Sequence, residues 1–262
     1  REVVDSKDHV AVPPDNPKYT LRRVWLTQEE EERFYYGFSN EALWPLCHIV
    51  YVKPKFDEAD WLIYKSVNQK FANVILEEVG NEKAFVFIQD YHFTLLPKML
   101  KESRPDLLVA QFWHIPWPNR EAFRICPWGH EILEGLLGND LMGFHVQYHC
   151  NNVLDTVDRN LESRIDYGKF TATKGGKTTH VRPFPISIDF EELNLLSQEK
   201  DVENEMVRMK RELGLKGQII GVGLDRVDYT KGIPERFKAI DRFLEKYPEY
   251  RNKFTFIQAG TI

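Results

Sequence analysis

Two fixed cations follow a short apolar run near the end of the chain. Arg226 and Lys231 lie in the stretch RVDYTKG, residues 226–232, directly after the strand-like run 218–223. Pro234 then opens a strongly amphipathic helical pattern over residues 235–247. Backbone N–H groups and the dipole at a helix N-terminus favour negative charge, and two cations add to that preference. The pattern predicts a phosphate or diphosphate site; the alternative is a helix start with a surface Arg and Lys.

Polar side chains also follow two strand-like runs in the first half of the chain. Asp90 and His92 come after the run 85–88, and His114 comes after the run 107–113. Ligands of parallel α/β sheets bind outside the carboxyl ends of the strands, so these groups are candidates for a sugar or phosphate site. The alternative readings are equally weighted: Asp90 caps the following helix, and His114 is a hydrogen-bonded core histidine.

Three other patterns are weaker. An aromatic cluster that contains Tyr35 and Trp44 could stack on sugar rings, although simple core packing is usually the better explanation of a lone aromatic cluster. His145, His149 and Cys150 have helical spacing, but no further ligand completes a metal site, and a helix surface is the favoured reading. Gly221 and Gly223 begin a dinucleotide fingerprint that Arg226 interrupts, which argues against a nicotinamide or flavin site.

The elements that must position these residues alternate along the chain. Apolar spacing predicts helices and continuous apolar runs predict strands, which together favour an α/β fold with a parallel doubly wound sheet. Gly175-Gly176 between β-prone flanks predicts a hairpin. The predicted helices are 61–79, 95–101, 131–137, 147–161, 189–195, 199–213 and 235–247, and the predicted strands are 84–88, 107–113, 140–144, 218–223 and 254–257.

Composition limits the class of protein. The chain has 262 residues, 42% hydrophobic and 29% charged, which is typical of a globular protein with two domains. A net charge of -5 without a basic tail argues against nucleic acid as a partner, and no apolar run is long enough to span a membrane. Three scattered cysteines, Cys47, Cys126 and Cys150, fit a reducing cytoplasm. Homo-oligomerisation is left open.

The motifs, in this order, resemble the trehalose-6-phosphate synthase family, which are retaining nucleotide-sugar glycosyltransferases of the GT-B fold. The resemblance spans roughly residues 20 to 258. The segments that carry it are 35–45, 89–97 (QDYHFTLLP), 114–118 (HIPWP), 140–144 (DLMGF), 183–189 (PFPISID) and 225–236 (DRVDYTKGIPER).

The resemblance implies a reaction and a set of roles. The family transfers glucose from UDP-glucose, or another nucleoside-diphosphate glucose, to glucose 6-phosphate with retention at the anomeric carbon. Arg226 and Lys231 are expected to hold the donor diphosphate, and His114 to lie near the transferred sugar. The acceptor pocket is expected to be lined by Tyr35, Trp44, Asp90, Tyr91 and His92. Asp90, His114, Arg226 and Lys231 are therefore the candidate catalytic residues, and no metal or other cofactor is expected.

The resemblance also implies domain limits. An acceptor-binding Rossmann-like domain is expected over 1–190, a helical connection over 191–216, and the start of a nucleotide-sugar-binding Rossmann-like domain over 217–262. The second domain and the extreme N-terminus of the first are expected to be truncated, so that the fragment alone is inactive. Two alternatives stay open: a synthase of glucosylglycerol phosphate that uses glycerol 3-phosphate, and a non-catalytic subunit of a trehalose complex.

Overall fold

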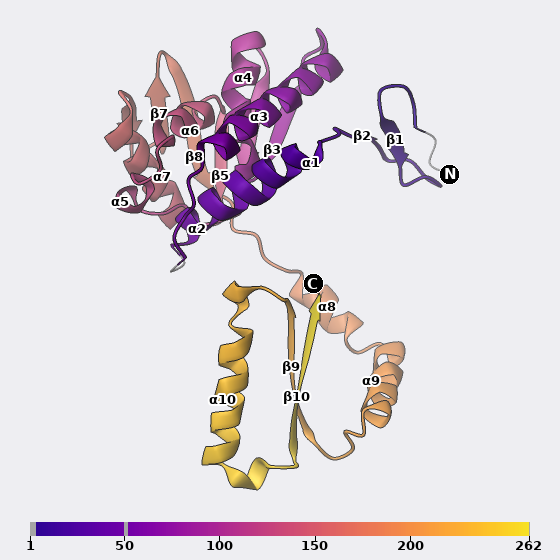
Figure 1. Cartoon of the computed structure of the whole chain (residues 1–262). Coiled ribbons are helices and arrows are strands. Elements are labelled where there is room, and N and C mark those ends of the chain that lie inside the picture. The colour runs from indigo at the N-terminus through magenta and orange to yellow at the C-terminus, as the bar shows by residue number, and fades with distance from the viewer. Residues whose placement is uncertain (1–3, 50–51, 262) are drawn as a thin grey trace. The chain divides into compact units, whose positions relative to one another are not determined.

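A computed structural model describes residues 4–49 and 52–261 of the chain. The chain divides into two compact units, residues 1–186 and 187–262 (Figure 1). The helical segment 191–216, expected to connect two domains, groups with the second unit. No helix of the described residues is long and apolar enough to cross a membrane.

The first unit is built around a six-stranded sheet in the order β3-β4-β5-β8-β7-β6. β3, β4, β5 and β8 run parallel, whereas β7 and β6 are antiparallel additions at one edge. The strands of the first unit are β1 (His9–Val12), β2 (Tyr19–Arg22), β3 (Phe85–Gln89), β4 (Leu108–Phe112), β5 (Leu141–Phe144), β6 (Arg164–Asp166), β7 (Thr171–Lys174) and β8 (Lys177–Pro183). The predicted parallel α/β architecture is confirmed for this unit.

The helices of the first unit are α1 (Gln28–Glu30), η1 (Glu31–Leu43), α2 (Trp44–His48), α3 (Glu58–Val79), η2 (Tyr91–Phe93), α4 (Leu96–Ser103), α5 (Arg120–Phe123), α6 (Gly129–Leu136) and α7 (Gln147–Asn160). Those predicted from apolar spacing correspond to α3, α4, α6 and α7. The predicted hairpin joins β7 to β8, and Gly175 and Gly176 have φ of 56° and 78°. A two-residue turn of this kind needs positive φ at both positions, which glycine adopts without strain.

The helices of the first unit pack on one face of the sheet. Val109 and Met142 point to that face and are buried in the clusters to which α3, α4, α6 and α7 contribute. On the opposite face Phe85 is 65% and Phe87 is 57% exposed. Gly138, just after α6, allows close contact with α4, because a β-carbon there would collide with the backbone at residues 97–98.

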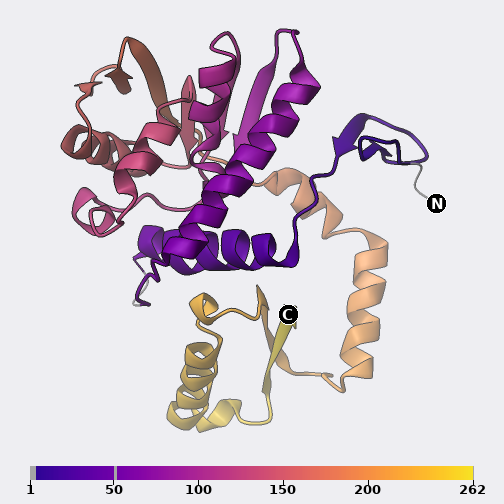
Figure 2. The ribbon, with the colours of Figure 1, turned by 45° about the horizontal axis from the view of Figure 1, so that its top comes forward.

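A π-helix, η1, lies against α3 at one end of this helical layer (Figure 2). It follows α1 without a break, and α1 begins with a capping box between Thr27 and Glu30. Phe34 and Phe38 of η1 are buried in the core. Gly37 lets η1 approach α3, since a β-carbon there would lie 2.6 Å from a carboxylate oxygen of Asp60. The aromatic pattern of this segment did not predict a helix.

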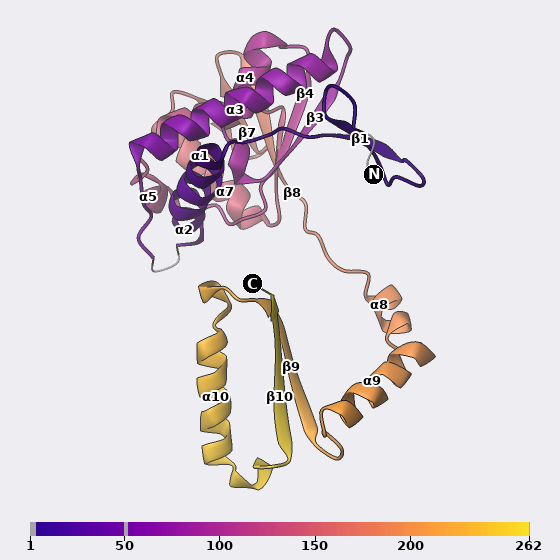
Figure 3. The ribbon, with the colours of Figure 1, turned by 45° about the vertical axis from the view of Figure 1, so that its right-hand side comes forward.

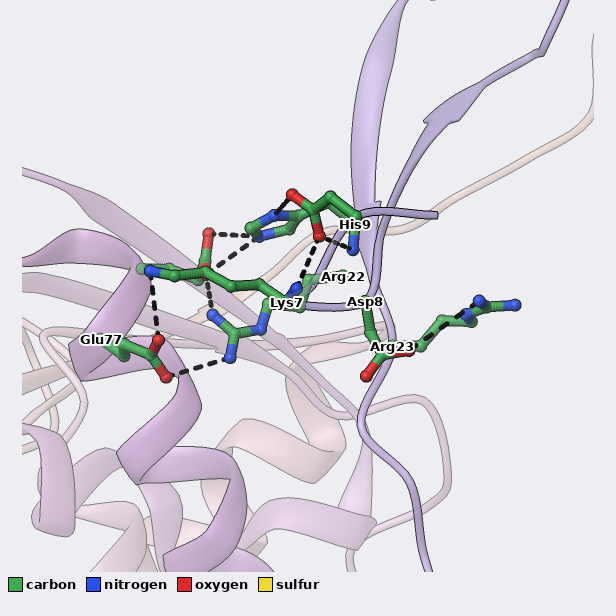
Figure 4. A network of polar contacts seen from close by, with 8 residues as sticks. Lys7, Asp8, His9, Arg22, Arg23 and Glu77 are labelled. Carbon is green, nitrogen blue, oxygen red and sulfur yellow. Dashed lines mark hydrogen bonds and ion pairs between the residues drawn. The ribbon is translucent and has the colours of Figure 1, made fainter. Parts of the chain in front are cut away.

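A short hairpin, β1–β2, is fixed to the C-terminal end of α3 by charged side chains (Figure 4). Arg22 contacts both Glu77 and Glu78, and Lys7 lies 3.2 Å from Glu77. His9 lies between Asp5, at 2.8 Å, and Glu78, at 3.0 Å. Hydrogen bonds to these two carboxylates raise the pKa of His9. This hairpin was not predicted from the sequence.

The second unit contains a parallel βαβ unit (Figure 3). β9 (Ile219–Arg226) and β10 (Phe254–Thr261) pair in parallel, and α10 (Ile233–Lys246) connects them. The remaining elements are α8 (Phe190–Leu196), α9 (Lys200–Glu212), η3 (Tyr229–Lys231) and η4 (Pro248–Tyr250). The predicted helix and both predicted strands are therefore confirmed, and the cationic loop lies between β9 and α10.

Candidate functional site

Asp90 and His114 meet at the carboxyl edge of the first sheet. Asp90 follows β3 and His114 comes two residues after β4, so the parallel pairing of these strands brings both residues to the same edge. The backbone N–H of His114 donates to Oδ1 of Asp90 at 3.1 Å. The backbone N–H of Asp90 in turn donates to the carbonyl of Phe112 at 2.8 Å. The two loops are therefore connected by hydrogen bonds in both directions.

Asp90 has a backbone conformation that side chains rarely adopt. Its φ is 64° and its ψ is -171°, a region occupied almost only by glycine. Its carboxylate makes no capping hydrogen bond to the short helix that follows. The alternative reading of Asp90 as a helix cap is therefore wrong. A residue held in such a conformation points to function when the surrounding structure fixes it.

A buried glutamine holds the backbone of Asp90. The Nε2 group of Gln111, in the middle of β4, donates to the carbonyl of Asp90 at 2.9 Å. Gln111 is only 1% exposed, and its Oε1 accepts from Nδ2 of Asn139, which is 2% exposed. Buried amides of this kind are costly unless they are hydrogen-bonded. Sequence reasoning missed Gln111; a glutamine inside an otherwise apolar strand was the available signal.

His114 is exposed and has a partner for one ring nitrogen. Its Nε2 lies 2.7 Å from Oε1 of Gln89, the last residue of β3. The ring packs edge-on against Phe112, with centroids 4.7 Å apart, and against His145, at 5.8 Å. Because the ring is exposed, the alternative reading of a core histidine is wrong.

Three of the predicted acceptor residues form one aromatic stack. Tyr35, from η1, stacks on His92 with ring centroids 5.3 Å apart and planes 7° apart. Tyr91 also stacks on His92, at 4.2 Å. The hydroxyl of Tyr91 donates to Oδ1 of Asn40, also in η1, at 2.8 Å. The aromatic residues of η1 therefore lie in two different environments. Phe34 and Phe38 are buried in the core, whereas Tyr35 is exposed.

Burial controls the charge of this stack. Burial lowers the pKa of His92, so the neutral imidazole is favoured. Within the described part of the chain, Nε2 of His92 is buried without a hydrogen-bond partner. Burial also raises the pKa of Tyr91, which keeps its hydroxyl protonated as a donor. The stack therefore presents uncharged aromatic groups beside the Asp90 carboxylate.

The fifth predicted acceptor residue, Trp44, begins α2. Its indole stacks on the ring of His48 with centroids 3.8 Å apart, and it is partly buried against the core. The structure places Trp44 directly after η1, the helix that carries Tyr35. Its role in acceptor binding stays a prediction.

For His145, His149 and Cys150 a helix surface was the favoured reading over a metal site, but the structure buries Cys150 and gives His149 a hydrogen-bonding role. Nδ1 of His149 accepts from the backbone N–H of Trp117 at 3.2 Å, so this histidine braces the loop after β4. Among residues 4–49 and 52–261, no cluster of three or more His, Cys, Asp or Glu side chains is arranged to hold a metal ion.

In the second unit both cations lie on the loop that follows β9. Arg226 is the last residue of β9 and Lys231 ends η3, and both side chains are exposed. Asp228 caps η3 by accepting from the backbone N–H of Thr230 at 2.8 Å. That hydrogen bond lowers the pKa of Asp228, and the charges of Lys231 and Arg226 contribute in the same direction. One carboxylate therefore lies close to both cations, and the loop adjoins the start of α10.

A third cation in this loop region is structural. Arg236, in the first turns of α10, lies 2.6 Å from Oδ2 of Asp225 and 2.6 Å from Oε1 of Gln258. This triad joins α10 to both strands of the unit. It fixes the helix start beside the loop, where Arg226 and Lys231 are exposed cations.

Comparison with known proteins decides the family. The model of glycosyltransferase family 20 matches residues 2–261 of the chain. The chain belongs to glycosyltransferase family 20. The resemblance inferred from the ordered motifs is thereby confirmed.

Relatives within the family carry a consistent name. A trehalose-6-phosphate synthase of Mycolicibacterium vanbaalenii is 38% identical over 252 residues, which cover 94% of this chain and 51% of the relative. A bifunctional trehalose-6-phosphate synthase/phosphatase of Thermoproteus tenax is 38% identical over 239 residues, covering 90% of this chain and 32% of the relative. The chain thus spans about half or less of the length of these family members.

Solved structures of the family share the fold. A UDP-forming alpha,alpha-trehalose-phosphate synthase from Burkholderia xenovorans, in complex with glucose 6-phosphate, superposes with a TM-score of 0.80 at 27% identity. That match covers 92% of this chain and 54% of the other. An E. coli protein bound with UDP-2-fluoro glucose gives a TM-score of 0.84 at 27% identity, covering 98% and 56%. The predicted GT-B type α/β fold is confirmed by these matches.

Proposed function

We propose that the protein that carries this chain transfers glucose from UDP-glucose to glucose 6-phosphate, giving trehalose 6-phosphate with retention at the anomeric carbon. The observation that carries the proposal is the assembly of Asp90, Tyr91, His92 and Tyr35 at one sheet edge, with His114 hydrogen-bonded to Asp90. Family members named for this reaction, with a UDP sugar or glucose 6-phosphate bound in their structures, support it.

The donor diphosphate is assigned to Arg226 and Lys231. Cleavage of the glycosidic bond transfers an electron pair to the departing diphosphate, whose negative charge grows in the transition state. Fixed cations placed where charge develops stabilise that transition state. The start of α10 beside the loop adds backbone N–H groups of the same polarity. With two cations in this role, the proposed reaction requires no metal ion.

The acceptor is assigned to the Asp90 edge. The carboxylate of Asp90 orients acceptor hydroxyls, and Tyr35, Trp44, Tyr91 and His92 supply aromatic surface and hydrogen-bonding groups for a hexose. No side chain is assigned as a covalent nucleophile. In a front-face reaction the departing phosphate accepts the proton of the incoming hydroxyl, so atoms and charge balance without one. His114 is assigned to the transferred sugar.

A coupled assay of UDP release tests the proposal. The natural polypeptide that contains these residues is incubated with UDP-glucose and glucose 6-phosphate, and trehalose 6-phosphate is identified by mass. Glycerol 3-phosphate is offered in competition with glucose 6-phosphate in a parallel reaction. The expected result is UDP release that depends on glucose 6-phosphate. Absence of UDP release with UDP-, ADP- and GDP-glucose would contradict the proposal. A preference for glycerol 3-phosphate would show that glycerol 3-phosphate, rather than glucose 6-phosphate, is the acceptor.

The proposed compartment is the cytoplasm. All three cysteines are buried free thiols, as expected of a protein that folds in a reducing compartment.

A further inference from the structure

Gln89 is the one residue whose side chain contacts a ring nitrogen of His114 among the described residues. It ends β3, is exposed, and places Oε1 at 2.7 Å from Nε2 of His114. An amide oxygen only accepts, so with the Gln89 amide in this orientation Nε2 of His114 carries the proton. In a neutral imidazole the other nitrogen, Nδ1, then has a free lone pair.

The remaining contacts of His114 fix its position but leave the tautomer undetermined. Asp90 accepts from its backbone N–H, and Phe112 and His145 pack against the ring edge-on. The titratable groups around the imidazole are therefore Asp90 and His145. Of these contacts, the hydrogen bond from Nε2 of His114 to Gln89 alone distinguishes Nε2 from Nδ1.

We propose that Gln89 is a positioning residue, which holds His114 in the Nε2–H tautomer so that Nδ1 accepts a hydrogen bond from a hydroxyl of the transferred hexose. The assignment of His114 to that sugar rests on the proposed function. The contact between Gln89 and His114 rests on the geometry alone. Gln89 also directly precedes Asp90, so the end of β3 positions both the Asp90 carboxylate and the His114 imidazole.

Substitutions at Gln89 can test its contact with His114 separately from the role of His114 in sugar binding. The Gln89 side chain is exposed, so its loss leaves the core intact. Gln89→Leu removes the acceptor at similar size. Gln89→Glu keeps an acceptor and adds a negative charge. Gln69→Glu is the control, since Gln69 is an exposed glutamine of α3 whose Nε2 donates to Oδ1 of Asn73, on the same helix.

The first measurement is NMR of the His114 imidazole in the 262-residue chain. In the parent we expect a protected proton on Nε2, and in Gln89→Leu that proton exchanges with solvent at least ten-fold faster. In Gln89→Glu the imidazolium is favoured relative to the parent, because a carboxylate replaces the amide beside the ring. Gln69→Glu leaves both observations as in the parent. A His114 signal unchanged in both Gln89 variants would overturn the proposed contact.

The second measurement is glucosyl transfer by the natural polypeptide. Gln89→Leu is expected to lower kcat about ten-fold with little change in KM for glucose 6-phosphate, as for a lost hydrogen bond to the transferred sugar. In Gln89→Glu the acid limb of the pH profile moves to higher pH, since a protonated ring has no lone pair to accept with. Parent-like kcat and pH profile in both variants would overturn the positioning role. If the parent transfers no glucose, the proposed function fails, and NMR still decides whether Gln89 orients His114.

Discussion

At the scale of single residues, Asp90 gives the strongest support for the proposed ligand site at this edge of the sheet. Its backbone is held in a glycine-like conformation by hydrogen bonds from Gln111 and to Phe112, while its carboxylate accepts from His114. A non-glycine residue with these angles costs on the order of 1–3 kcal/mol. A glycine would remove that strain, so the presence of the strain at Asp90 supports the assignment of the carboxylate to the proposed acceptor site.

This strain makes a prediction about stability. Asp90→Gly and Asp90→Ala both remove the carboxylate, but only glycine adopts a φ of 64° without strain. We expect Asp90→Gly to be more stable than Asp90→Ala by about 1 kcal/mol. Urea unfolding of both variants, followed by circular dichroism, measures the difference. Equal midpoints, or a more stable alanine variant, would show that the conformation is relaxed.

At the scale of elements, ion pairs join the β7–β8 hairpin to helices α4 and α6. Glu134 of α6 contacts Lys98 of α4 at 2.8 Å and Lys174 of β7 at 3.1 Å. The hydrogen bond from Lys98, followed by that from Lys174, lowers the pKa of Glu134 to about 2. Because the carboxylate is 25% exposed, solvent weakens the pair only in part.

The linkage of this carboxylate to pH gives a second prediction. A carboxylate whose pKa is depressed on folding stabilises the protein above its unfolded pKa of 4.5, and the contribution disappears as pH falls toward about 2. Glu134→Gln is therefore expected to lose about 1 kcal/mol at pH 7, after allowance for solvent screening. The difference from the parent should vanish at the acid end of this window.

Urea midpoints from pH 7 down to about pH 2 test the prediction. Glu131→Gln is the matched control, because Glu131 lies on the same helix, forms an ion pair with Lys65 and has 48% of its side chain exposed. We expect the control to change stability by less than about 0.5 kcal/mol. A loss at Glu134 that stays constant over this pH range would mean that packing, rather than charge, is responsible.

The elements also show what the sequence could predict. Helices with regular apolar spacing, such as α3 and α10, and strands written as apolar runs, such as β3 and β9, were found because local pattern and tertiary burial agree in them. The hairpin at Gly175-Gly176 was found because its turn requires those residues. The π-helix η1 was missed because some of its aromatic residues are buried in the core and others form the exposed stack on His92. Its apolar residues therefore do not show a simple helical spacing.

The candidate site could also be predicted in part, where the parallel topology alone determines the position of a residue. Asp90 and His114 follow strands, and parallel topology alone places them at one edge. Gln111 was missed although a glutamine inside an apolar strand was a signal, whereas Gln89 could not be chosen from the sequence, because its role depends on strand register. β3 and β4 pair so that Gln89 lies opposite Phe112, which places the amide near the histidine two residues further on.

At the scale of the whole molecule, the proposed substrates divide between the two units. The groups assigned to the acceptor belong to residues 1–186, and the cations assigned to the donor diphosphate belong to residues 187–262. Each unit contains its own strand-to-helix loop that carries the relevant residues. Binding of the two substrates should therefore respond separately to substitutions in the two units.

A crossed binding experiment tests this division. Lys231→Ala should weaken UDP binding about ten-fold, as expected for loss of a hydrogen bond to a charged group, and leave glucose 6-phosphate binding unchanged. Asp90→Asn should weaken glucose 6-phosphate binding and leave UDP binding unchanged. Lys238→Ala, an exposed lysine of α10, is the control and should affect neither ligand. Calorimetric titration of each variant with each ligand measures all six affinities. If Lys231→Ala leaves UDP binding intact, the loop after β9 is not the diphosphate site. If either variant weakens the binding of both ligands equally, the assignment of one ligand to each unit is wrong.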